Sequence, residues 1–331
     1  MKKNKLTIIC CITNLLIIIS LVVIYGPYDN FKKWWISNAM SSGHHKWLAN
    51  VLYSKDTIKK VLLDNIVVEI NENTDTDSIT FTPSTTGEYS SIYEKQILER
   101  EDDKPYKLIR IKENDYSGYL VAIYEPERIS LATSSNIEHG GSQMLNLASE
   151  HEAIVAINAS GFSRKNGALK PVGTVIENGE VKSVGVRNRH GGGLIGFTYD
   201  NVLMLTTDNA EIAIEKGMRD AMTFGPFLIV NGIPSEVLGD GGLGVANRTA
   251  IAQRKDGIVL FLVIDGRGAD GSNGISINDM ITLLQNYGAY NAANLDGGGS
   301  STLVIENELI NNPRGYGYTG SRYLPNAWIL K

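Results

Sequence analysis

A long apolar run near the N-terminus most limits how this chain can fold. The run extends from Leu6 to Tyr25 without a charged residue, and Lys2, Lys3 and Lys5 precede it. At 1.5 Å per residue, a helix of about twenty residues spans roughly 30 Å, the thickness of the hydrocarbon layer of a bilayer. No small-residue cleavage signature follows, so we expect residues 1–25 to be a retained transmembrane signal anchor. The lysines favour a cytoplasmic N-terminus, which would place the rest of this single-pass chain outside the cell.

The composition narrows the class of protein. Of the 331 residues, 43% are hydrophobic and 20% are charged, which is typical of a folded globular protein. The net charge is −5 and no basic stripe is visible, so we expect no nucleic-acid partner. Cys10 and Cys11 are the only cysteines, which excludes disulfides, thiolate zinc sites and cysteine nucleophiles downstream. An exported domain without cysteine is typical of a Gram-positive surface protein.

The chain after the apolar run divides into three parts. Residues 26–70 contain tryptophans and aliphatic residues at helical spacings, and we expect a helical juxtamembrane stalk. Residues 71–104 begin with a stretch rich in Asn, Thr, Asp and Ser, and are expected to form a linker. Residues 105–331 are expected to form an α+β catalytic domain around a mixed β-sheet. Hairpin turns are predicted at Asn178-Gly179 and Asp256-Gly257.

A β-α-β unit is predicted near the C-terminus. The apolar strand 258–264 ends in Asp265, Ser276 begins a helix with a capping box, and the strand 290–295 ends in Asp296. Such a unit normally gives two parallel strands with a right-handed crossover, and ligands collect at their carboxyl ends. Neighbouring strands are ~4.8 Å apart, so Asp265 and Asp296 are predicted to share one edge of the sheet within reach of one substrate.

The segment from Asp296 to Ser301 is the sharpest functional signal. Its three consecutive glycines would let the backbone approach a ligand, and their N–H groups could form an anion-binding nest. The alternative is a plain turn before the next strand. Arg248 and Arg267 stand near the ends of predicted strands, where a planar guanidinium could bind phosphate or carboxylate, or form an exposed ion pair. Asn158 follows another buried strand and could bring an amide to the same pocket.

Six segments, in order between Tyr119 and Ile329, resemble the phosphodiester glycosidases. They are Ile157 to Phe162, Pro171 to Ile176, Phe224 to Pro226, Arg248 to Ile251, Ile264 to Arg267 and Asn294 to Thr302. The sequence departs from the family pattern at Ala159-Ser160, Asn247 and Ala252, and the first departure could change the shape of the pocket. The resemblance implies hydrolysis of a sugar-1-phosphodiester at the anomeric carbon, which releases free sugar and a phosphomonoester.

The chemistry of this reaction leads to a hypothesis for the roles of individual residues. Asp296 would be the nucleophile or the base for water, Asp265 would assist or orient it, and Arg248 and Arg267 would bind phosphate. The remaining candidate substrate-binding residues are Asn158, Gly161, Phe162, Gly225, Gly297, Gly298, Gly299, Ser300 and Ser301. No metal or cofactor is expected in the reaction, although an acidic cluster in the glycine-rich loops could hold a structural calcium ion.

The expected partners are the lipid bilayer and a glycopolymer or glycolipid that contains sugar phosphate. Extracellular placement suggests teichoic-acid-like or capsular polymers, or lipid-linked sugar phosphates. Two other functions remain open: a surface protein that binds anionic glycopolymers without turnover, and a metal-dependent phosphodiesterase. The latter would use Asp265 and Asp296 with Asp240 or Asp270 as oxygen ligands.

Overall fold

The computed structural model divides the chain into two compact units. One comprises Met1–Ile66 and Leu238–Gly244, and the other comprises Val67–Val237 and Val245–Lys331. We call them the helical unit and the catalytic unit and describe each by itself. The structure describes the following residues: 2–41, 45–70, 73–81, 87–100, 103–185, 191–266, 268, 271–315, 318–319 and 321–331.

The helical unit contains α1 (Lys2–Tyr25), α2 (Asp29–Ser41), α3 (Lys46–Leu52) and α4 (Lys55–Leu63). In α1, the segment Ile8–Tyr25 is long and apolar enough to cross a membrane. Its length and composition match those of a signal anchor or a signal peptide. The three shorter helices bury a small common core made of Ile36, Ala39, Ala49, Tyr53, Ile58 and Val61.

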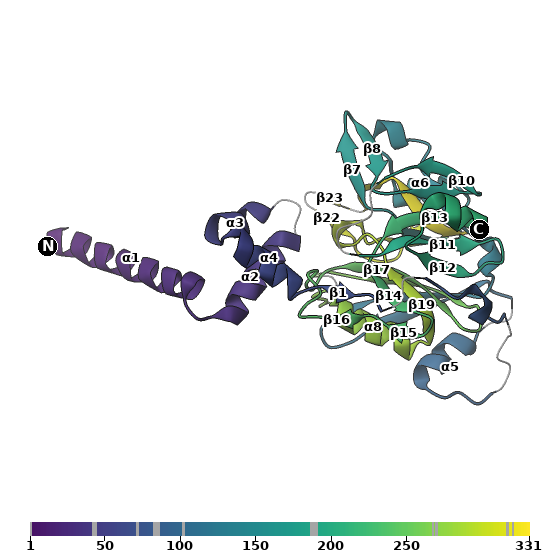
Figure 1. The fold of residues 1–331 in the computed structure, drawn as a ribbon, viewed down its shortest axis with the longest axis horizontal. Coiled ribbons are helices and arrows are strands. Elements are labelled where there is room, and N and C mark those ends of the chain that lie inside the picture. Colours follow the sequence, from purple (N-terminus) through teal and green to yellow (C-terminus); the bar gives the residue numbers. More distant parts are fainter. Residues whose placement is uncertain are drawn as a thin grey trace. The chain divides into compact units, whose positions relative to one another are not determined.

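Three larger β-sheets, of five or seven strands, form most of the catalytic unit (Figure 1). The seven-stranded sheet has the order β15 (Ile233–Pro234), β14 (Phe227–Val230), β19 (Ala289–Asn294), β17 (Arg248–Arg254), β18 (Val259–Ile264), β3 (Ser117–Ile123) and β2 (Tyr106–Lys112). A five-stranded sheet has the order β10 (Glu180–Ser183), β9 (Val175–Glu177), β13 (Met218–Phe224), β11 (Gly193–Thr198) and β12 (Leu203–Thr206). The other has the order β21 (Glu308–Leu309), β20 (Leu303–Ile305), β6 (Val155–Asn158), β25 (Asn326–Leu330) and β4 (Ile129–Thr133).

One hydrophobic core joins the three sheets. Buried side chains from all three meet there, and the rings of Phe197 and Trp328 pack edge-on with centroids 5.5 Å apart. The outer faces are covered by α6 (Met144–Glu150), α7 (Ala210–Glu215) and α8 (Ile277–Asn286). The core therefore leaves the ends of the strands, rather than their faces, for a functional site.

Several local predictions are confirmed. The Ser276 hydroxyl accepts a hydrogen bond from the Asp279 N–H at 3.1 Å, which caps α8. Asn178 and Gly179 both have positive φ in the turn between β9 and β10, and Gly257 has positive φ in the turn between β17 and β18. The α+β class is also confirmed. Every strand pair recorded among the described residues is antiparallel, so parallel directions occur between strands that are not adjacent.

The β-α-β unit differs from its prediction in one respect. Strands β18 and β19 run in the same direction, but β17 lies between them and pairs with both in antiparallel register. The strands that carry Asp265 and Asp296 are therefore two strand spacings apart, about 10 Å, rather than one. β17 lies beside β18 because the Asp256-Gly257 turn joins the two strands in a hairpin.

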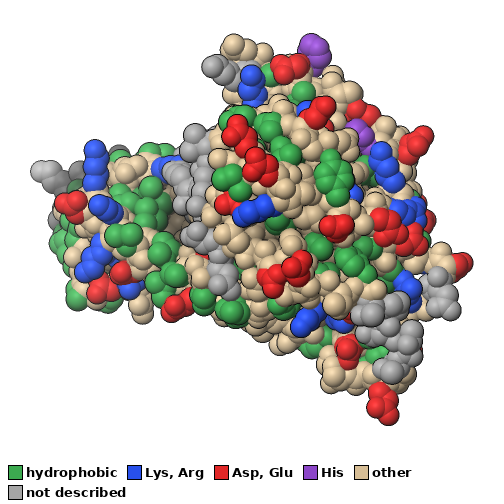
Figure 2. All heavy atoms as spheres, turned by 45° about the vertical axis from the view of Figure 1, so that its right-hand side comes forward, with side chains coloured by type: hydrophobic (Ala, Val, Ile, Leu, Met, Phe, Trp, Pro, Cys, Tyr) green, Lys and Arg blue, Asp and Glu red, His purple; other side chains and the backbone are tan. Residues whose placement is uncertain are grey.

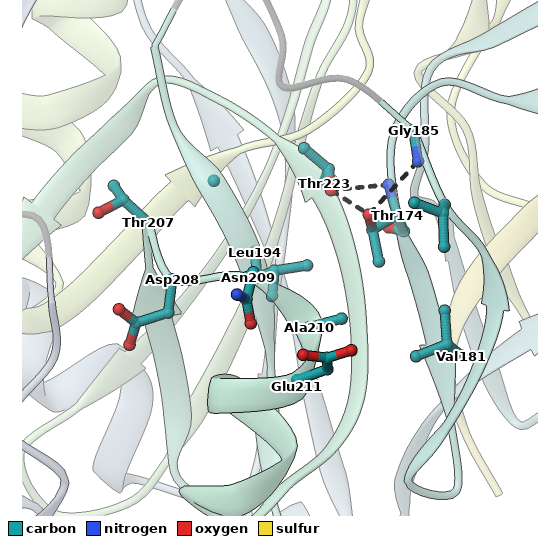
Figure 3. A pocket seen from close by; sticks show the side chains of 12 residues that line it. Thr174, Val181, Gly185, Leu194, Thr207, Asp208, Asn209, Ala210, Glu211 and Thr223 are labelled. Atoms are coloured by element: carbon teal, nitrogen blue, oxygen red, sulfur yellow. Dashed lines mark hydrogen bonds between the residues drawn. The ribbon is translucent and has the colours of Figure 1, made fainter.

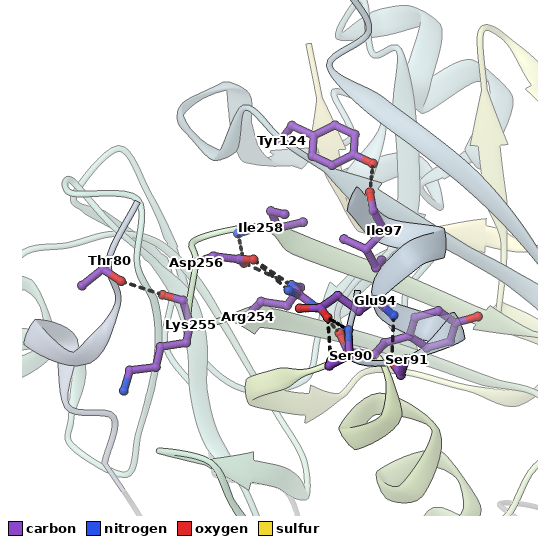
Figure 4. A network of polar contacts seen from close by, with 11 residues as sticks. Thr80, Ser90, Ser91, Glu94, Ile97, Tyr124, Arg254, Lys255, Asp256 and Ile258 are labelled. Carbon is purple, nitrogen blue, oxygen red and sulfur yellow. Dashed lines mark hydrogen bonds and ion pairs between the residues drawn. The ribbon is translucent and has the colours of Figure 1, made fainter. Parts of the chain in front are cut away.

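Helix α5 (Ile92–Leu98) lies in the segment for which a linker is predicted, and its Ile97 is fully buried. The Tyr124 hydroxyl donates a 2.6 Å hydrogen bond to the Ile97 carbonyl (Figure 4). At the carboxyl end of β17, Arg254 forms an ion pair with Asp256 at 2.8 Å. The hydrogen bond from Tyr124 fastens α5 to the end of β3 in the seven-stranded sheet.

The remaining strands form short pairs: β1 (Val67–Val68) with β16 (Glu236–Val237), β5 (Ser142–Gln143) with β24 (Tyr323–Leu324), β7 (Phe162–Lys165) with β8 (Ala168–Pro171), and β22 (Arg314–Gly315) with β23 (Tyr318–Thr319). The first pair assigns Val67 and Val68 to the catalytic unit.

Candidate active site

The candidate site lies at the edge of the seven-stranded sheet where β18 and β19 end and β17 begins. Arg248, the first residue of β17, pairs with Ile264 of β18, and Ala250 pairs with Asn294 of β19. The Leu295 N–H donates to the Thr249 carbonyl at 2.9 Å. The register therefore places the start of β17, with Arg248, between the strands that end at Asp265 and Asp296.

Asp296 has an environment unlike that of an ordinary surface carboxylate. Burial raises the pKa of Asp296 to about 6, while hydrogen bonds from the Ser300 hydroxyl and the Gly297 N–H and the positive charge of Arg322 act in the opposite direction. At neutral pH the carboxylate is ionised but more basic than usual. A pKa near the working pH is what general acid–base chemistry requires.

The glycine-rich loop holds Asp296 through its own hydrogen bonds. The Gly298 N–H donates to the Asn247 carbonyl at 2.9 Å, and the N–H groups of Ser300 and Ser301 donate to Gly297 and Gly298 at 3.2 Å each. The Gly297 N–H meets the Asp296 carboxylate. Of the three glycine N–H groups predicted to form an anion-binding nest, those of Gly297 and Gly298 are thus used within the protein. Ser300 and Ser301 are fully buried, whereas Gly298 and Gly299 are partly exposed.

Two of the glycines in this region have no room for a side chain. A Cβ at Gly297 would lie 2.9 Å from the Asn247 carbonyl oxygen. A Cβ at Gly161 would lie 2.8 Å from the Phe224 ring and 3.9 Å from Asp296 Oδ1. Gly161 therefore lies beside the Asp296 carboxylate, as its prediction as a site residue requires.

Arg322 is the residue that the sequence analysis missed. Its guanidinium carbon lies 5.0 Å from the centre of the Phe162 ring, and its Nη1 points to the Ser300 hydroxyl at 3.5 Å. Phe162, predicted from one motif, and Asp296 and Ser300, predicted from another, come together around this side chain. No local pattern singles out Arg322, because its position depends on the pairing of β24 with β5.

Asn158 binds the protein rather than facing a ligand. Its Nδ2 donates to the Asp296 carbonyl at 2.5 Å, and its Oδ1 accepts from the Thr249 hydroxyl at 2.7 Å and the Thr302 N–H at 3.1 Å. The side chain is fully buried. Asn158 thus ties the end of β6 to β17 and to both ends of the Asp296 loop, and acts as a positioning residue.

Asp265 is also a positioning residue in this geometry. The carboxylate is buried, and its Oδ1 accepts hydrogen bonds from the Asn311 amide at 3.0 Å and the Asn312 N–H at 3.1 Å. Asp265 therefore anchors the loop that follows β21. Gly225 is likewise a positioning residue. Its carbonyl accepts a hydrogen bond from the Asn294 amide at 3.0 Å, which holds the end of β19.

Of the two arginines predicted to bind phosphate, the structure describes one. Arg248 is buried, and its Nη1 would lie 4.0 Å from a Cβ at Gly297, beside the Asp296 loop. Arg267 lies outside the described residues. The arrangement so far is a basic carboxylate with arginines around it, which suits charge stabilisation at an anionic leaving group.

The sequence model described as phosphodiester glycosidase matches residues 151–331, which include Asp296, Arg248, Asp265, Asn158 and Arg322. The chain belongs to the phosphodiester glycosidase family. A glycosidase-type hydrolase function follows from this membership and from the fold.

Three further proteins are similar to this chain. The SPbeta prophage-derived uncharacterized protein YomE of Bacillus subtilis is 35% identical over 176 residues, which cover 51% of this chain and 27% of that relative. The catalytic domain of zebrafish N-acetylglucosamine-1-phosphodiester alpha-N-acetylglucosaminidase, auto-inhibited by its pro-peptide, matches with a TM-score of 0.55 and 18% identity, covering 70% of this chain and 85% of that domain. A hypothetical protein from Synechocystis matches with a TM-score of 0.50 and 20% identity, covering 68% and 61%. The structural matches show a shared fold.

A separate cavity of about 530 Å³ lies on the five-stranded sheet that contains β13 (Figure 3). Its lining includes Thr174, Leu194, Asp208 and Thr223, and none of the glycosidase site residues. Leu194 and Thr223 are paired across β11 and β13, and Leu194 packs with the core under α7. The cavity is therefore on the outer face of that sheet and does not belong to the Asp296 site.

The carboxylates of the described residues do not gather as metal ligands. Among the described residues, no group of three or more His, Cys, Asp or Glu could hold a metal ion. Asp240 belongs to the helical unit, and Asp270 lies outside the described residues.

Proposed function

We propose that this protein is a membrane-anchored, extracellular phosphodiester glycosidase that hydrolyses the anomeric C–O bond of a sugar-1-phosphodiester. The observation that carries the proposal is the Asp296 carboxylate, whose pKa of about 6 is set by burial beside Ser300 and Arg322. A carboxylate of this kind can activate water, and arginines beside it can stabilise the phosphate that departs.

The chemistry assigns each group a step. Asp296 takes a proton from water as the water oxygen forms a bond to the anomeric carbon. The bond between that carbon and the phosphate oxygen breaks, and its electron pair leaves with the phosphomonoester. Because a phosphomonoester is a good leaving group, it needs charge stabilisation more than a general acid, and Arg322 and Arg248 would supply this. Direct attack by Asp296, followed by hydrolysis of a covalent intermediate, uses the same residues.

The proposed location rests on α1. Three lysines lie in the first turn of this helix, before its apolar segment, and no acidic residue accompanies them in residues 1–25, which favours a cytoplasmic N-terminus. The catalytic unit would then act outside the cell on a surface glycopolymer or glycolipid that contains sugar phosphate, for example an N-acetylglucosamine-1-phosphodiester.

The full chain in nanodiscs, given an N-acetylglucosamine-1-phosphodiester with and without EDTA, tests the proposal. We expect free sugar and phosphomonoester in both conditions, and no product from Asp296→Asn. The matched control is Asp200→Asn, because Asp200 is exposed on a turn far along the chain from the site and should keep full activity. Sugar phosphate formed only with a divalent metal would instead indicate a phosphodiesterase, and affinity for anionic glycopolymers without turnover would indicate a binding protein.

A further inference from the structure

The short helices after α1 expose large apolar side chains. Trp34 on α2 is 59% exposed, and Trp47 and Val51 on α3 are 59% and 70% exposed. Trp47 and Val51 are four residues apart and therefore lie on one face of α3. Contiguous exposed apolar surface on a folded protein marks an interaction site.

This face of α3 adjoins a groove in the helical unit. The groove has a volume of about 340 Å³ and is lined by Asn50, Lys55, Ile58, Lys59, Leu62, Leu63 and Ile66. Asn50 belongs to the same face of α3 as Trp47 and Val51, so the groove and the exposed residues form one continuous surface. We call it the α3–α4 surface. Its base is aliphatic, and Lys55 and Lys59 border it one helical turn apart.

The charge of the helical unit is opposite to that of the whole chain. The chain carries a net −5, yet the lysines between residues 26 and 66 outnumber the acids there. The lysines are Lys32, Lys33, Lys46, Lys55, Lys59 and Lys60, and the acids are Asp29, Asp56 and Asp64. Figure 2 shows hydrophobic and basic side chains next to one another on the helical unit. Aromatic and aliphatic groups mixed with lysines are the pattern of interfacial membrane helices.

A direct contact ties these helices to the end of α1. The Tyr53 hydroxyl donates a hydrogen bond to the Ile24 carbonyl at 3.2 Å, and the Tyr53 and Tyr25 rings pack edge-on at 6.4 Å. Ile24 lies in the last turn of α1, where the carbonyl has no partner within the helix. If α1 spans a bilayer, the chain leaves the bilayer near Ile24. The hydrogen bond from Tyr53 then holds the junction of α3 and α4 beside the bilayer surface.

We propose that the α3–α4 surface docks on a bilayer that contains anionic phospholipids. Trp47, Val51 and Leu63 would enter the headgroup layer, and Lys55 and Lys59 would bind the phosphates. The inference rests on the membrane anchoring included in the proposed function. It adds a second attachment to the bilayer beside α1, made by the helical unit itself.

Fluorescence quenching in nanodiscs tests the docking. The full chain is reconstituted, one copy per nanodisc, with an environment-sensitive dye on a single cysteine and lipids that carry a spin label on a shallow acyl carbon. Cys10 and Cys11 are replaced by Ser, except when Cys10 itself carries the dye. The dye is placed at Val51→Cys, at Leu63→Cys, or at Val184→Cys, which is 83% exposed in the catalytic unit and serves as the reference.

We expect several-fold stronger quenching at positions 51 and 63 than at position 184 with phosphatidylglycerol, and weaker quenching with phosphatidylcholine alone. One Lys at an anionic surface contributes roughly fivefold to such an equilibrium. Lys55→Gln/Lys59→Gln should therefore lower the ratio of docked to free surface by roughly 30-fold. The charge-matched control Lys112→Gln/Lys170→Gln, at exposed positions of the catalytic unit, should leave the ratio of docked to free surface unchanged.

Equal quenching at positions 51, 63 and 184 in anionic nanodiscs would overturn the docking proposal. The Cys10 dye separates this failure from a failure of anchoring, because it reports on α1 alone. A quenched Cys10 dye with unquenched dyes at 51 and 63 retains the anchor and rejects docking. Hydrolysis of a soluble substrate, measured on the same samples, tests the glycosidase proposal independently.

Discussion

The Ser300 hydroxyl links Asp296 to Arg322. It donates to the Asp296 carboxylate and lies 3.5 Å from Arg322 Nη1, so the negative and positive groups meet through one buried side chain. Asp296, Ser300 and Arg322 are thereby joined in one network of polar contacts. Changes at any of them should alter the protonation of Asp296.

The pH dependence of hydrolysis should show one limb near pH 6. Because the pKa of Asp296 is raised to about 6 and the carboxylate must be ionised to accept a proton, kcat/KM should rise through pH 6 and level off above pH 7. An activity that falls over this range would show that the protonated acid is the active form.

Ser300→Ala should move this limb to higher pH. The hydrogen bond from Ser300 lowers the pKa of Asp296, so its removal lets burial raise the pKa further. A hydrogen bond worth about 1 kcal/mol corresponds to roughly 0.7 pH unit. Ser301→Ala, which removes a buried hydroxyl with no partner among the described residues, should leave the limb in place. A limb that stays at the same pH in Ser300→Ala would contradict the hydrogen bond.

Substitutions of Arg322 should separate its charge from its shape. Arg322→Ala removes a charge that lowers the pKa of Asp296, so the limb should move upward and KM should rise at least tenfold. Arg322→Lys should restore the limb but not KM, because an ammonium cannot reproduce the planar guanidinium that stacks on Phe162. Kinetics over pH 4–9 measure both, and equal recovery of both parameters in the Lys variant would assign no role to shape.

Gly161→Ala should impair catalysis without unfolding the protein. The added Cβ would lie 2.8 Å from the Phe224 ring, which must move next to Asp296. Displacements of about 1 Å at a reacting centre cost up to about 100-fold, so we expect kcat/KM to fall at least tenfold. Gly87→Ala, where a Cβ meets nothing within 4 Å, is the matched control. Wild-type kinetics in Gly161→Ala would place the substrate away from this wall.

Asn158→Ala should lower the free energy of unfolding by about 3 kcal/mol, because three buried hydrogen bonds are lost and their partners stay buried. Urea denaturation of the variant measures the loss. Asn278→Ala, at an exposed position of α8, should change stability by less than about 0.5 kcal/mol. An equally small effect at Asn158 would mean that its amide is not structural.

The sequence predicted features that depend on neighbouring residues. Ser276 caps α8 and the Asp256-Gly257 turn forms a hairpin because both signals act within a few residues. The insertion of β17 between β18 and β19 depends on contacts between distant segments, so the predicted spacing of Asp265 and Asp296 was wrong. Local pattern also cannot tell a ligand-binding amide from a structural one, which is why Asn158 was assigned to the substrate.

Arg322 escaped prediction for a related physical reason. It is positioned by the pairing of Tyr323 and Leu324 with Gln143 and Ser142, and by a hydrogen bond from the Met144 N–H to the Ser321 hydroxyl at 2.9 Å. These contacts join segments far apart in the chain. Asp296, by contrast, was singled out by a local motif, because three consecutive glycines and two serines follow it.

The place of β25 has a consequence for the order in which the strands of its sheet can pair. Because β25 pairs with β4 on one side and β6 on the other, both of those strands keep an open edge until it arrives. A chain that emerges from a translocon with its N-terminus first would therefore hold two adhesive edges exposed during export. Closure of this sheet must wait for β25, which follows every other strand of the sheet in the chain.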